Sequence, residues 1–231
     1  MSQAIRAKND TREIQIPSGD VTLNGELTIP RNAAGVVIFA HGSGSSRHSP
    51  RNQSVARTIR NAGLGTLLFD LLTRDEEASD VYTRHLRFDI DLLAERLVHA
   101  TSWLKGEFDH IRAGYFGAST GAAAALVAAA QLGEIVGAVV SRGGRPDLAA
   151  DSLPLVKAPT LLIVGSLDYP VIEMNRQAYA RLECEKEVEI VSGATHLFEE
   201  PGTLDQVAHL AADWFQTHLH SSRRERSRER G

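Results

Sequence analysis

One serine stands between two glycines where residues 117–121 read GASTG, with an apolar run before the motif and an alanine-rich run after it. A serine at a sharp turn from a strand into a helix adopts a strained backbone conformation that exposes its hydroxyl. The small residues on either side let the strand and the helix approach each other closely. The motif alone is a weak signal, but its flanking runs supply the strand and the helix that a nucleophilic serine needs. Ser119 is therefore the candidate nucleophile.

A serine hydroxyl needs a general base, and the base needs a carboxylate that orients it. At a turn of this kind the partners follow in the order serine, acid, histidine, each at the end of a later strand. Asp168 follows the apolar run 160–164, and His196 follows the apolar run 188–191. Taken alone, Asp168 would also suit a turn or a helix cap, and His196 would suit an ordinary loop. Their order and their positions together favour a Ser119–Asp168–His196 triad.

Acyl transfer also requires two N–H donors for the oxyanion of the tetrahedral intermediate. The first is expected from Thr120, the residue after the nucleophile, and the second from the loop after the third strand. That loop reads HGSGSS at 41–46, and its glycines allow the backbone to approach a substrate. Ser43 is the favoured second donor and Gly44 the close alternative, with His41 supporting the loop through side-chain hydrogen bonds. The competing interpretation is a flexible Gly/Ser loop without a function.

Two arginines follow the sixth expected strand, in the segment SRGGRPD at 141–147. A guanidinium binds a carboxylate or a phosphate through two parallel hydrogen bonds, so Arg142 or Arg145 is a candidate for holding an anionic group of the substrate. The alternative is that one of them pairs with Asp147 or another nearby acid.

The cluster RHSPRN at 47–52 follows the oxyanion loop, where it either lines the entrance of the cleft or caps the next helix. Asp70, at a strand end, could approach the site. A buried link from Asp70 to Arg47 or Arg51 is equally compatible with the sequence.

Alternating strand-like and helix-like segments predict an α/β fold with a mostly parallel eight-stranded sheet covered by helices on both faces. No helix separates the first two strands, so they should pair antiparallel at one edge. Residues 73–80 read as a polar loop. The segment 141–155 is too short for a cap domain, which predicts an open site. The expected strands are 13–17, 21–29, 36–40, 66–69, 113–116, 136–140, 160–164 and 188–191, and the expected helices are 52–62, 88–105, 119–131, 147–150, 173–182 and 204–219.

The chain has 231 residues, a formal net charge of −4 and 42% hydrophobic residues, which is typical of one globular domain. These values do not favour nucleic acid as a partner, and no apolar run reaches the length of a membrane span. The N-terminal residues lack the apolar core of a signal peptide. A lone cysteine, Cys184, fits a reducing, cytoplasmic setting. The sequence leaves the oligomeric state open between a monomer and a homodimer.

The expected domain organisation has three parts. Residues 1–12 form an N-terminal extension, residues 13–220 form a single catalytic domain, and residues 221–231 form an arginine-rich tail. The tail carries five arginines, two glutamates and no apolar residue, so it is expected to be disordered. A docking site for an acidic partner is the alternative interpretation of the tail.

Four segments, HGSGSS, GASTG, LIVGSLD and GATHLFEEPG, make the chain resemble an α/β-hydrolase of the dienelactone hydrolase-like family. The resemblance extends over about residues 13–219. It implies an α/β-hydrolase fold and hydrolysis of esters, with Ser119 as nucleophile, Asp168 as acid and His196 as base. It likewise implies that Thr120 and Ser43 supply the oxyanion donors. Dienelactone hydrolases themselves carry cysteine at the nucleophile position, so the serine here places the chain nearer the broader group.

The sequence therefore predicts a serine carboxylesterase that cleaves small soluble esters through an acyl-enzyme. No metal or organic cofactor is expected, because no spaced cluster of His, Cys or Asp residues stands out. Thioesterase, peptidase and acyltransferase reactions would use the same groups. A ligand-binding or scaffolding module that retained the fold is the non-catalytic alternative.

Overall fold

The computed structural model describes residues 10–220, so the predicted tail at 221–231 lies outside the described residues. Eight strands form one sheet in the order β1-β2-β4-β3-β5-β6-β7-β8. β1 is antiparallel to β2, β2 is antiparallel to β4, and the other neighbours are parallel, which confirms the predicted sheet and its antiparallel edge. The first strand begins earlier than expected. The strands are β1 (Asp10–Ser18), β2 (Val21–Ile29), β3 (Gly35–Ala40), β4 (Gly65–Phe69), β5 (Arg112–Ala118), β6 (Val136–Arg142), β7 (Thr160–Gly165) and β8 (Lys186–Val191).

The central strands are apolar on both sides because helices cover both faces of the sheet. Every residue of β3 is buried, and its side chains alternate between two cores, as expected for strands with a period of two. Val36 and Ile38 belong to one core, whereas Val37 and Phe39 belong to the other.

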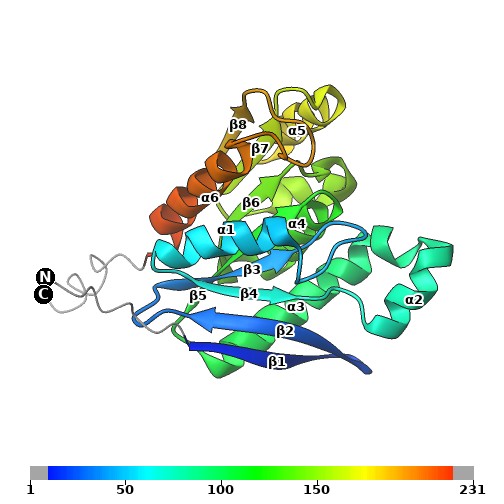
Figure 1. Cartoon of the computed structure of the whole chain (residues 1–231), viewed down its shortest axis with the longest axis vertical. Helices are drawn as coiled ribbons and strands as arrows, with labels where there is room; N and C mark the ends of the chain where they lie inside the picture. Colours follow the sequence, from blue (N-terminus) through cyan, green and yellow to red (C-terminus); the bar gives the residue numbers. More distant parts are fainter. Residues whose placement is uncertain (1–9, 221–231) are drawn as a thin grey trace, which may run out of the picture.

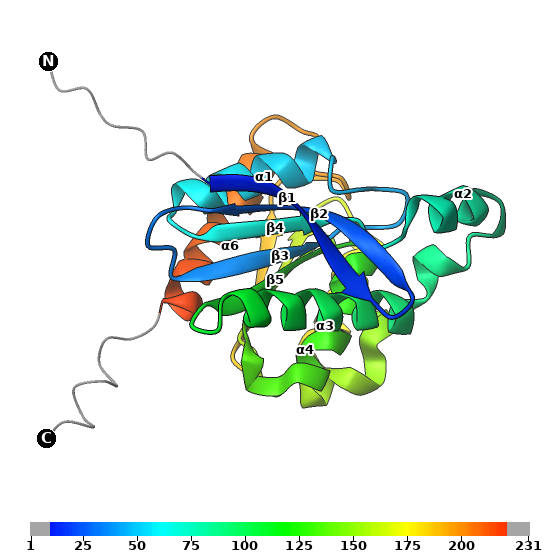
Figure 2. The ribbon, with the colours of Figure 1, turned by 90° about the horizontal axis from the view of Figure 1, so that it is seen from below.

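The helices form two layers around the sheet (Figure 1). Seen from below in Figure 2, α1 and α6 lie on one side of the strands, and α3 and α4 lie on the other. The core under α1 and α6 is separate from the core under α3, α4 and α5. No helix within residues 10–220 combines the length and the apolar character needed to cross a bilayer. The helices of these layers are α1 (Pro50–Asn61), α3 (Ile90–Glu107), α4 (Thr120–Leu132), α5 (Tyr169–Arg181) and α6 (Thr203–Leu219).

The prediction of a polar loop at 73–80 is wrong, because these residues form most of helix α2 (Arg74–Thr83). The helix has little apolar periodicity, so the hydrophobic pattern did not indicate it. Its start is fixed by a capping box, in which Thr73 and Glu76 each bond to the backbone N–H of the other. The Glu76 carboxylate also pairs with the buried Arg96 of α3 at 2.7 Å. Local capping and a tertiary ion pair therefore stabilise a helix that extends beyond the sheet (Figure 1).

The segment after β6 forms the 3₁₀-helix η3 (Pro146–Leu155), which is longer than the short helix expected at 147–150. It packs against α4 and α5. This arrangement agrees with the expected lack of a cap domain after β6.

The order of the strands brings two loops together at the carboxyl edge of the sheet. β3 lies between β4 and β5 in the sheet. After β3 the chain forms β4 on one side of β3, and it then crosses to form β5 on the other side. Open α/β sheets bind ligands in the crevice at such a reversal point. Ala40 at the end of β3 is paired with Gly117 near the end of β5, so the loop after β3 lies beside Ser119.

Candidate active site

Ser119 occupies a strained turn between β5 and α4. Its backbone has φ 51° and ψ −120°, a region that a residue with a side chain rarely adopts. Two backbone hydrogen bonds hold Ser119 in this conformation. The Ser119 N–H donates to the Arg142 carbonyl at 3.2 Å, and the Ser119 carbonyl accepts from the Arg145 N–H at 3.1 Å. The segment after β6 therefore holds the turn in place.

The two glycines of the GASTG motif are required by close contact. A Cβ atom on Gly117 would lie 2.4 Å from Ala122 Cα, and a Cβ atom on Gly121 would lie 2.2 Å from the Ala40 carbonyl oxygen. Both neighbours are backbone atoms, which cannot rotate away as a side chain can. The glycines thus let the first turn of α4 approach the ends of β3 and β5.

We expect Gly121→Ala to destabilise the protein by about 1–3 kcal/mol, because the added methyl group must displace the end of β3. Urea unfolding would measure the loss. Gly106→Ala is the matched control, since a Cβ there meets no atom within 4 Å. That control should be stabilising by roughly 0.5–1 kcal/mol, the ordinary gain of alanine over glycine inside a helix. Equal stability of Gly121→Ala and the wild-type protein would contradict the proposed clash.

His196 and Asp168 are joined by a hydrogen bond of 2.6 Å between Nδ1 and Oδ2. Because a carboxylate only accepts, the Nδ1–H donates and the Nε2 atom keeps its lone pair. Asp168 stands at the N-cap position of α5 but makes no capping bond with its side chain. Its carboxylate is mostly buried, with 12% of the side chain exposed, whereas the His196 side chain is 39% exposed.

Ser119 and His196 are brought to the same place by the segment 142–145. A Cβ on Gly143 would lie 3.5 Å from the His196 ring atoms Cε1 and Nδ1, and the preceding Arg142 carbonyl bonds the Ser119 N–H. Within residues 10–220, no hydrogen bond links the Ser119 hydroxyl to the imidazole in this structure. Catalytic hydrogen bonds are often long without substrate and tighten in the complex.

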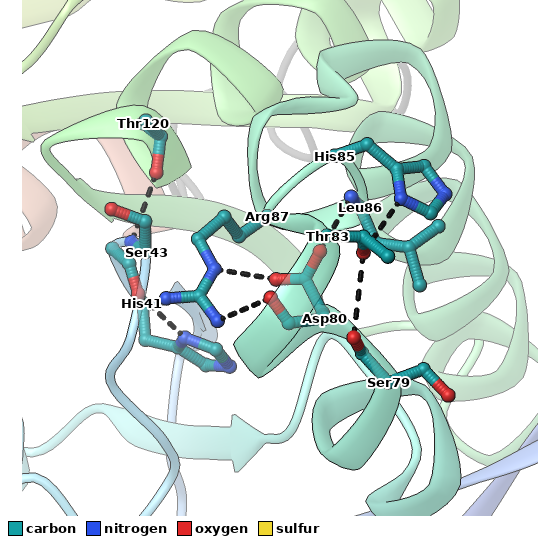
Figure 3. A network of polar contacts seen from close by, with 10 residues as sticks. His41, Ser43, Ser79, Asp80, Thr83, His85, Leu86, Arg87 and Thr120 are labelled. Carbon is teal, nitrogen blue, oxygen red and sulfur yellow. Dashed lines mark hydrogen bonds and ion pairs between the residues drawn. The ribbon is translucent and has the colours of Figure 1, made fainter.

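The loop after β3 is fixed to the start of α4. The Ser43 N–H donates to the Thr120 hydroxyl at 3.0 Å, a contact drawn in Figure 3. Gly42 lies against the nucleophile, because a Cβ there would be 3.2 Å from Ser119 Cβ. The favoured oxyanion donor, Ser43, therefore already has a partner inside the protein.

His41 supports this loop with both ring nitrogens. Nε2 accepts from the Leu71 N–H at 3.0 Å, and Nδ1 lies 3.0 Å from the Gly42 carbonyl, to which it donates. Burial lowers the pKa of His41, so the neutral ring that this pattern needs is favoured. The ring therefore positions the loop.

A cavity of about 630 Å³ opens beside the oxyanion loop. Gly42, Ser43 and Gly44 form one wall, and residues of α2 and α3 contribute another. The pKa of Glu77, on the α2 wall, is raised by burial and by the negative charge of Asp70. The sequence analysis did not predict the α2 wall, because it assigned these residues to a loop. The capping box of Thr73 and Glu76 was the signal in the sequence that could have indicated the helix. The lining also includes Arg51, Leu71, Leu72, Asp80, Val81, Arg87 and Leu93.

The α2 wall is tied to the rest of the protein by the buried Asp80. Its carboxylate pairs with the Arg87 guanidinium and accepts from the Leu86 N–H at 2.8 Å (Figure 3). A Cβ on Gly44 would lie 3.7 Å from Arg87 Nη1, so this ion pair borders the oxyanion loop.

The two candidate anion-binding arginines differ in their surroundings. Arg145 forms a bidentate ion pair with Asp147, with distances of 2.9 and 2.8 Å. Pairing with Asp147 was the alternative to binding an anionic group of the substrate. Arg142 is 8% exposed and has no carboxylate partner among the described residues. The structure thus leaves the guanidinium of Arg142, and not that of Arg145, free of an acidic partner.

Asp70 does not enter the site as a free carboxylate. It accepts from the Arg47 N–H at 2.8 Å and pairs with the Arg47 guanidinium. Of the two possibilities that the sequence left open for Asp70, an approach to the site or a link to an arginine, the structure shows the link, with Arg47 as the partner. Within residues 10–220, no group of three or more His, Cys, Asp or Glu side chains is arranged to hold a metal ion.

Comparisons with known proteins identify the family of this chain. The model of the dienelactone hydrolase family matches residues 23–221. A crystal structure of a dienelactone hydrolase from Anabaena variabilis is 58% identical, with a TM-score of 0.90 over 92% of this chain and 99% of that chain. Est1E from Butyrivibrio proteoclasticus is 15% identical, with a TM-score of 0.76 over 90% of this chain and 99% of that chain, and so shares the fold.

A Mycobacterium tuberculosis protein, matched in two strains, is 57% identical over 209 residues. Its name gives phosphoribosyl transferase as a provisional assignment. The match covers 90% of this chain, which spans just under half of the relative, 46% of its length. From the family model, the identity to the Anabaena enzyme and the shared sheet, we conclude that this chain belongs to the dienelactone hydrolase family and has the α/β-hydrolase fold.

Proposed function

We propose that the chain is a serine hydrolase that cleaves small soluble carboxylic esters through an acyl-enzyme on Ser119. The observation that carries the proposal is the 2.6 Å bond between His196 and Asp168 next to a serine with φ 51°. A strained serine at a strand-to-helix turn, followed by an acid and a histidine at later strand ends, is the arrangement of a nucleophile and its base.

In the proposed reaction, the Ser119 hydroxyl turns towards His196 Nε2 and attacks the ester carbonyl as the imidazole accepts its proton. Asp168 keeps the proton on Nδ1 and stabilises the imidazolium that forms. The imidazolium then protonates the leaving alcohol, and the acyl group remains on Ser119. A water molecule deprotonated by the same imidazole releases the acid and restores the serine.

The oxyanion is stabilised by the Thr120 N–H and by an N–H of the glycine loop. Thr120 is the first residue of α4, so its N–H has no acceptor within the helix and the helix dipole favours negative charge there. The second donor is the Gly44 N–H, because the Ser43 N–H already donates to the Thr120 hydroxyl. The bond from Ser43 to the Thr120 hydroxyl sets the distance between this loop and Ser119.

We expect Thr120→Val to lower kcat/KM by about tenfold, or about 1.4 kcal/mol, because the loop loses its bond to α4. Thr120→Ser keeps the hydroxyl and should stay within about threefold of the wild-type protein, a difference below 1 kcal/mol. Hydrolysis of a nitrophenyl ester would measure both variants. A Thr120→Val enzyme as active as the wild type would mean that the hydroxyl does not position the loop.

The cavity beside the loop supports a small substrate. Its volume of about 630 Å³ lies within the range of pockets for small molecules, roughly 300–1,000 Å³. Leu71, Leu72 and Leu93 give it an apolar surface that suits a short acyl or alcohol group. A chain-length series of nitrophenyl esters should therefore show a preference for short acyl groups.

A fluorophosphonate probe tests the proposal directly, since it labels an activated serine. We expect stoichiometric labelling of the folded chain, with the mass increase located on the peptide that contains Ser119. Product analysis in the presence of added alcohols would distinguish hydrolysis from acyl transfer. A folded protein that ignores the probe and every activated ester would favour the ligand-binding module instead.

A further inference from the structure

Asn175 is a fully buried asparagine in the middle of helix α5. Its amide nitrogen Nδ2 donates to two carbonyl oxygens, that of Val171 one turn earlier at 2.8 Å and that of Gly144 at 3.1 Å. Since a carbonyl only accepts, the nitrogen of the amide and not its oxygen must face both partners. The second bond joins α5 to the segment 142–145.

The stability of the helix by itself does not explain this residue. An asparagine inside a helix is less favourable than an alanine or a leucine. The buried Oδ1 atom of Asn175 has no hydrogen-bond partner within residues 10–220, and an unpaired buried acceptor costs free energy. The bond that leaves the helix is the compensating interaction, so the role of Asn175 is found at Gly144.

Gly144 belongs to the segment that holds both Ser119 and His196. Backbone groups at the two ends of the segment 142–145 form the hydrogen bonds to the Ser119 N–H and carbonyl. Gly143, the neighbour of Gly144, lies against the His196 ring. A displacement of Gly144 would therefore shift the supports of the proposed nucleophile and of the proposed base together.

Helix α5 also carries the proposed acid. Asp168 is the N-cap residue of α5, and Asn175 follows about two helical turns later on the same face of the helix. The Asp168 carboxylate binds His196 at 2.6 Å, and the Asn175 amide binds Gly144 at 3.1 Å. One face of α5 thus contacts the histidine at one end and the segment that supports the histidine and the serine further along.

A backbone bond to β7 and the bond from Asn175 both fix the segment 142–145. The Gly143 N–H donates to the Ile163 carbonyl of β7 at 2.8 Å. That bond survives any change of side chain. The bond from Asn175 to Gly144 depends on one side chain, so a substitution at Asn175 releases α5 from the segment and leaves the bond to the sheet in place.

We propose that Asn175 is a positioning residue, which ties α5 to Gly144. This tie sets the distance between Ser119 and the imidazole of His196 that Asp168 orients. The role rests on the proposed function, because Asn175 acts through the proposed triad. The described residues that line the cavity beside the oxyanion loop come from elements other than α5. The effect of Asn175 therefore falls on proton transfer and not on the binding of the substrate.

Two substitutions of Asn175 remove the bond to Gly144. Asn175→Leu replaces the amide by an apolar side chain of similar volume, and Asn175→Ser keeps a smaller hydroxyl that reaches only the carbonyl one turn earlier. Both variants should lower kcat for nitrophenyl butyrate by about 10- to 100-fold, as a small misplacement of the reacting groups does. KM should keep its wild-type value, because the cavity is unchanged.

Ala178→Gly is the matched control, because it weakens α5 at a buried position one turn after Asn175 and leaves the amide in place. This variant should lower the midpoint of thermal unfolding by about 2–4 °C, the effect of a glycine inside a helix. Its kcat should equal that of the wild-type enzyme.

Proton NMR supplies a readout that needs no catalysis. The Nδ1–H of His196 lies in a short hydrogen bond to the Asp168 carboxylate, so its resonance should appear far downfield, and His196→Gln would assign it. The resonance should move upfield in Asn175→Leu and Asn175→Ser and stay in place in Ala178→Gly. If the wild type cleaves no ester while the resonance moves as expected, the proposed function fails and the positioning role of Asn175 stands.

Any of three results would overturn the proposal. The first is the wild-type kcat in both Asn175 variants, and the second is an unchanged His196 resonance in both. The third is an Ala178→Gly enzyme whose kcat falls as far as that of Asn175→Leu, which would show that any weakening of α5 reduces activity.

Discussion

Ser119→Ala is expected to reduce kcat/KM for nitrophenyl butyrate by about 10⁴- to 10⁶-fold, or about 5.5–8 kcal/mol, the range seen when a catalytic serine is removed from a triad. The reason is that Ser119 is the residue of the turn between β5 and α4 whose hydroxyl is held on a strained backbone with positive φ. The same variant should lose all fluorophosphonate labelling. Steady-state kinetics and intact-mass measurement would check the two effects together.

The matched control is Ser102→Ala, which removes an exposed hydroxyl from helix α3. That control should keep the wild-type rate and the wild-type labelling. Circular dichroism and thermal unfolding should be unchanged for both variants, because the hydroxyl of Ser119 makes no hydrogen bond to the described residues. Labelling that persists in Ser119→Ala would place the reactive serine elsewhere and end the proposed mechanism.

Asp168→Asn is expected to lower kcat by about 10⁴-fold, the loss known for this change in a serine triad. The carboxylate accepts the Nδ1–H of His196 at 2.6 Å and thereby fixes the tautomer in which Nε2 is a base. An asparagine amide can donate to Nδ1 instead, and the proton then moves to Nε2, where it blocks proton transfer from Ser119. Stopped-flow measurement of nitrophenol release would separate the slowed acylation step from product release.

Asp151→Asn serves as the control for Asp168→Asn, since Asp151 is fully exposed and lies 3.6 Å from Arg181. It should behave as the wild-type enzyme. An Asp168→Asn enzyme within about tenfold of the wild-type rate, a loss of only about 1.4 kcal/mol, would mean that the carboxylate does not orient the histidine.

The positions of Ser119, Asp168 and His196 could be predicted from the sequence because each follows an apolar run that forms a parallel strand. In a parallel sheet the carboxyl ends of the strands meet at one edge, so order along the chain becomes proximity in space. The same pattern predicted the eight strands, since buried strands require near-continuous apolar runs.

Helix α2 was missed because its stability does not come from an apolar stripe. Its residues are mostly polar, and its anchors are the pairs Asp80–Arg87 and Glu76–Arg96, the second of which joins α2 to α3. A pattern of hydrophobic residues cannot report such contacts. The capping box was the local signal that would have placed the start of the helix.

The sequence by itself determined the sheet, the order of the proposed catalytic groups and the glycines that surround Ser119, because strand periodicity and turn sterics are local properties of the chain. Only the tertiary structure decided which arginine has a partner and how the loop after β3 is held. Arg145 meets Asp147 two residues away, whereas the guanidinium of Arg142 lies over the ring of Phe198, which follows β8. Burial and charge pairing depend on approaches between distant segments, and these exist only once the sheet has assembled.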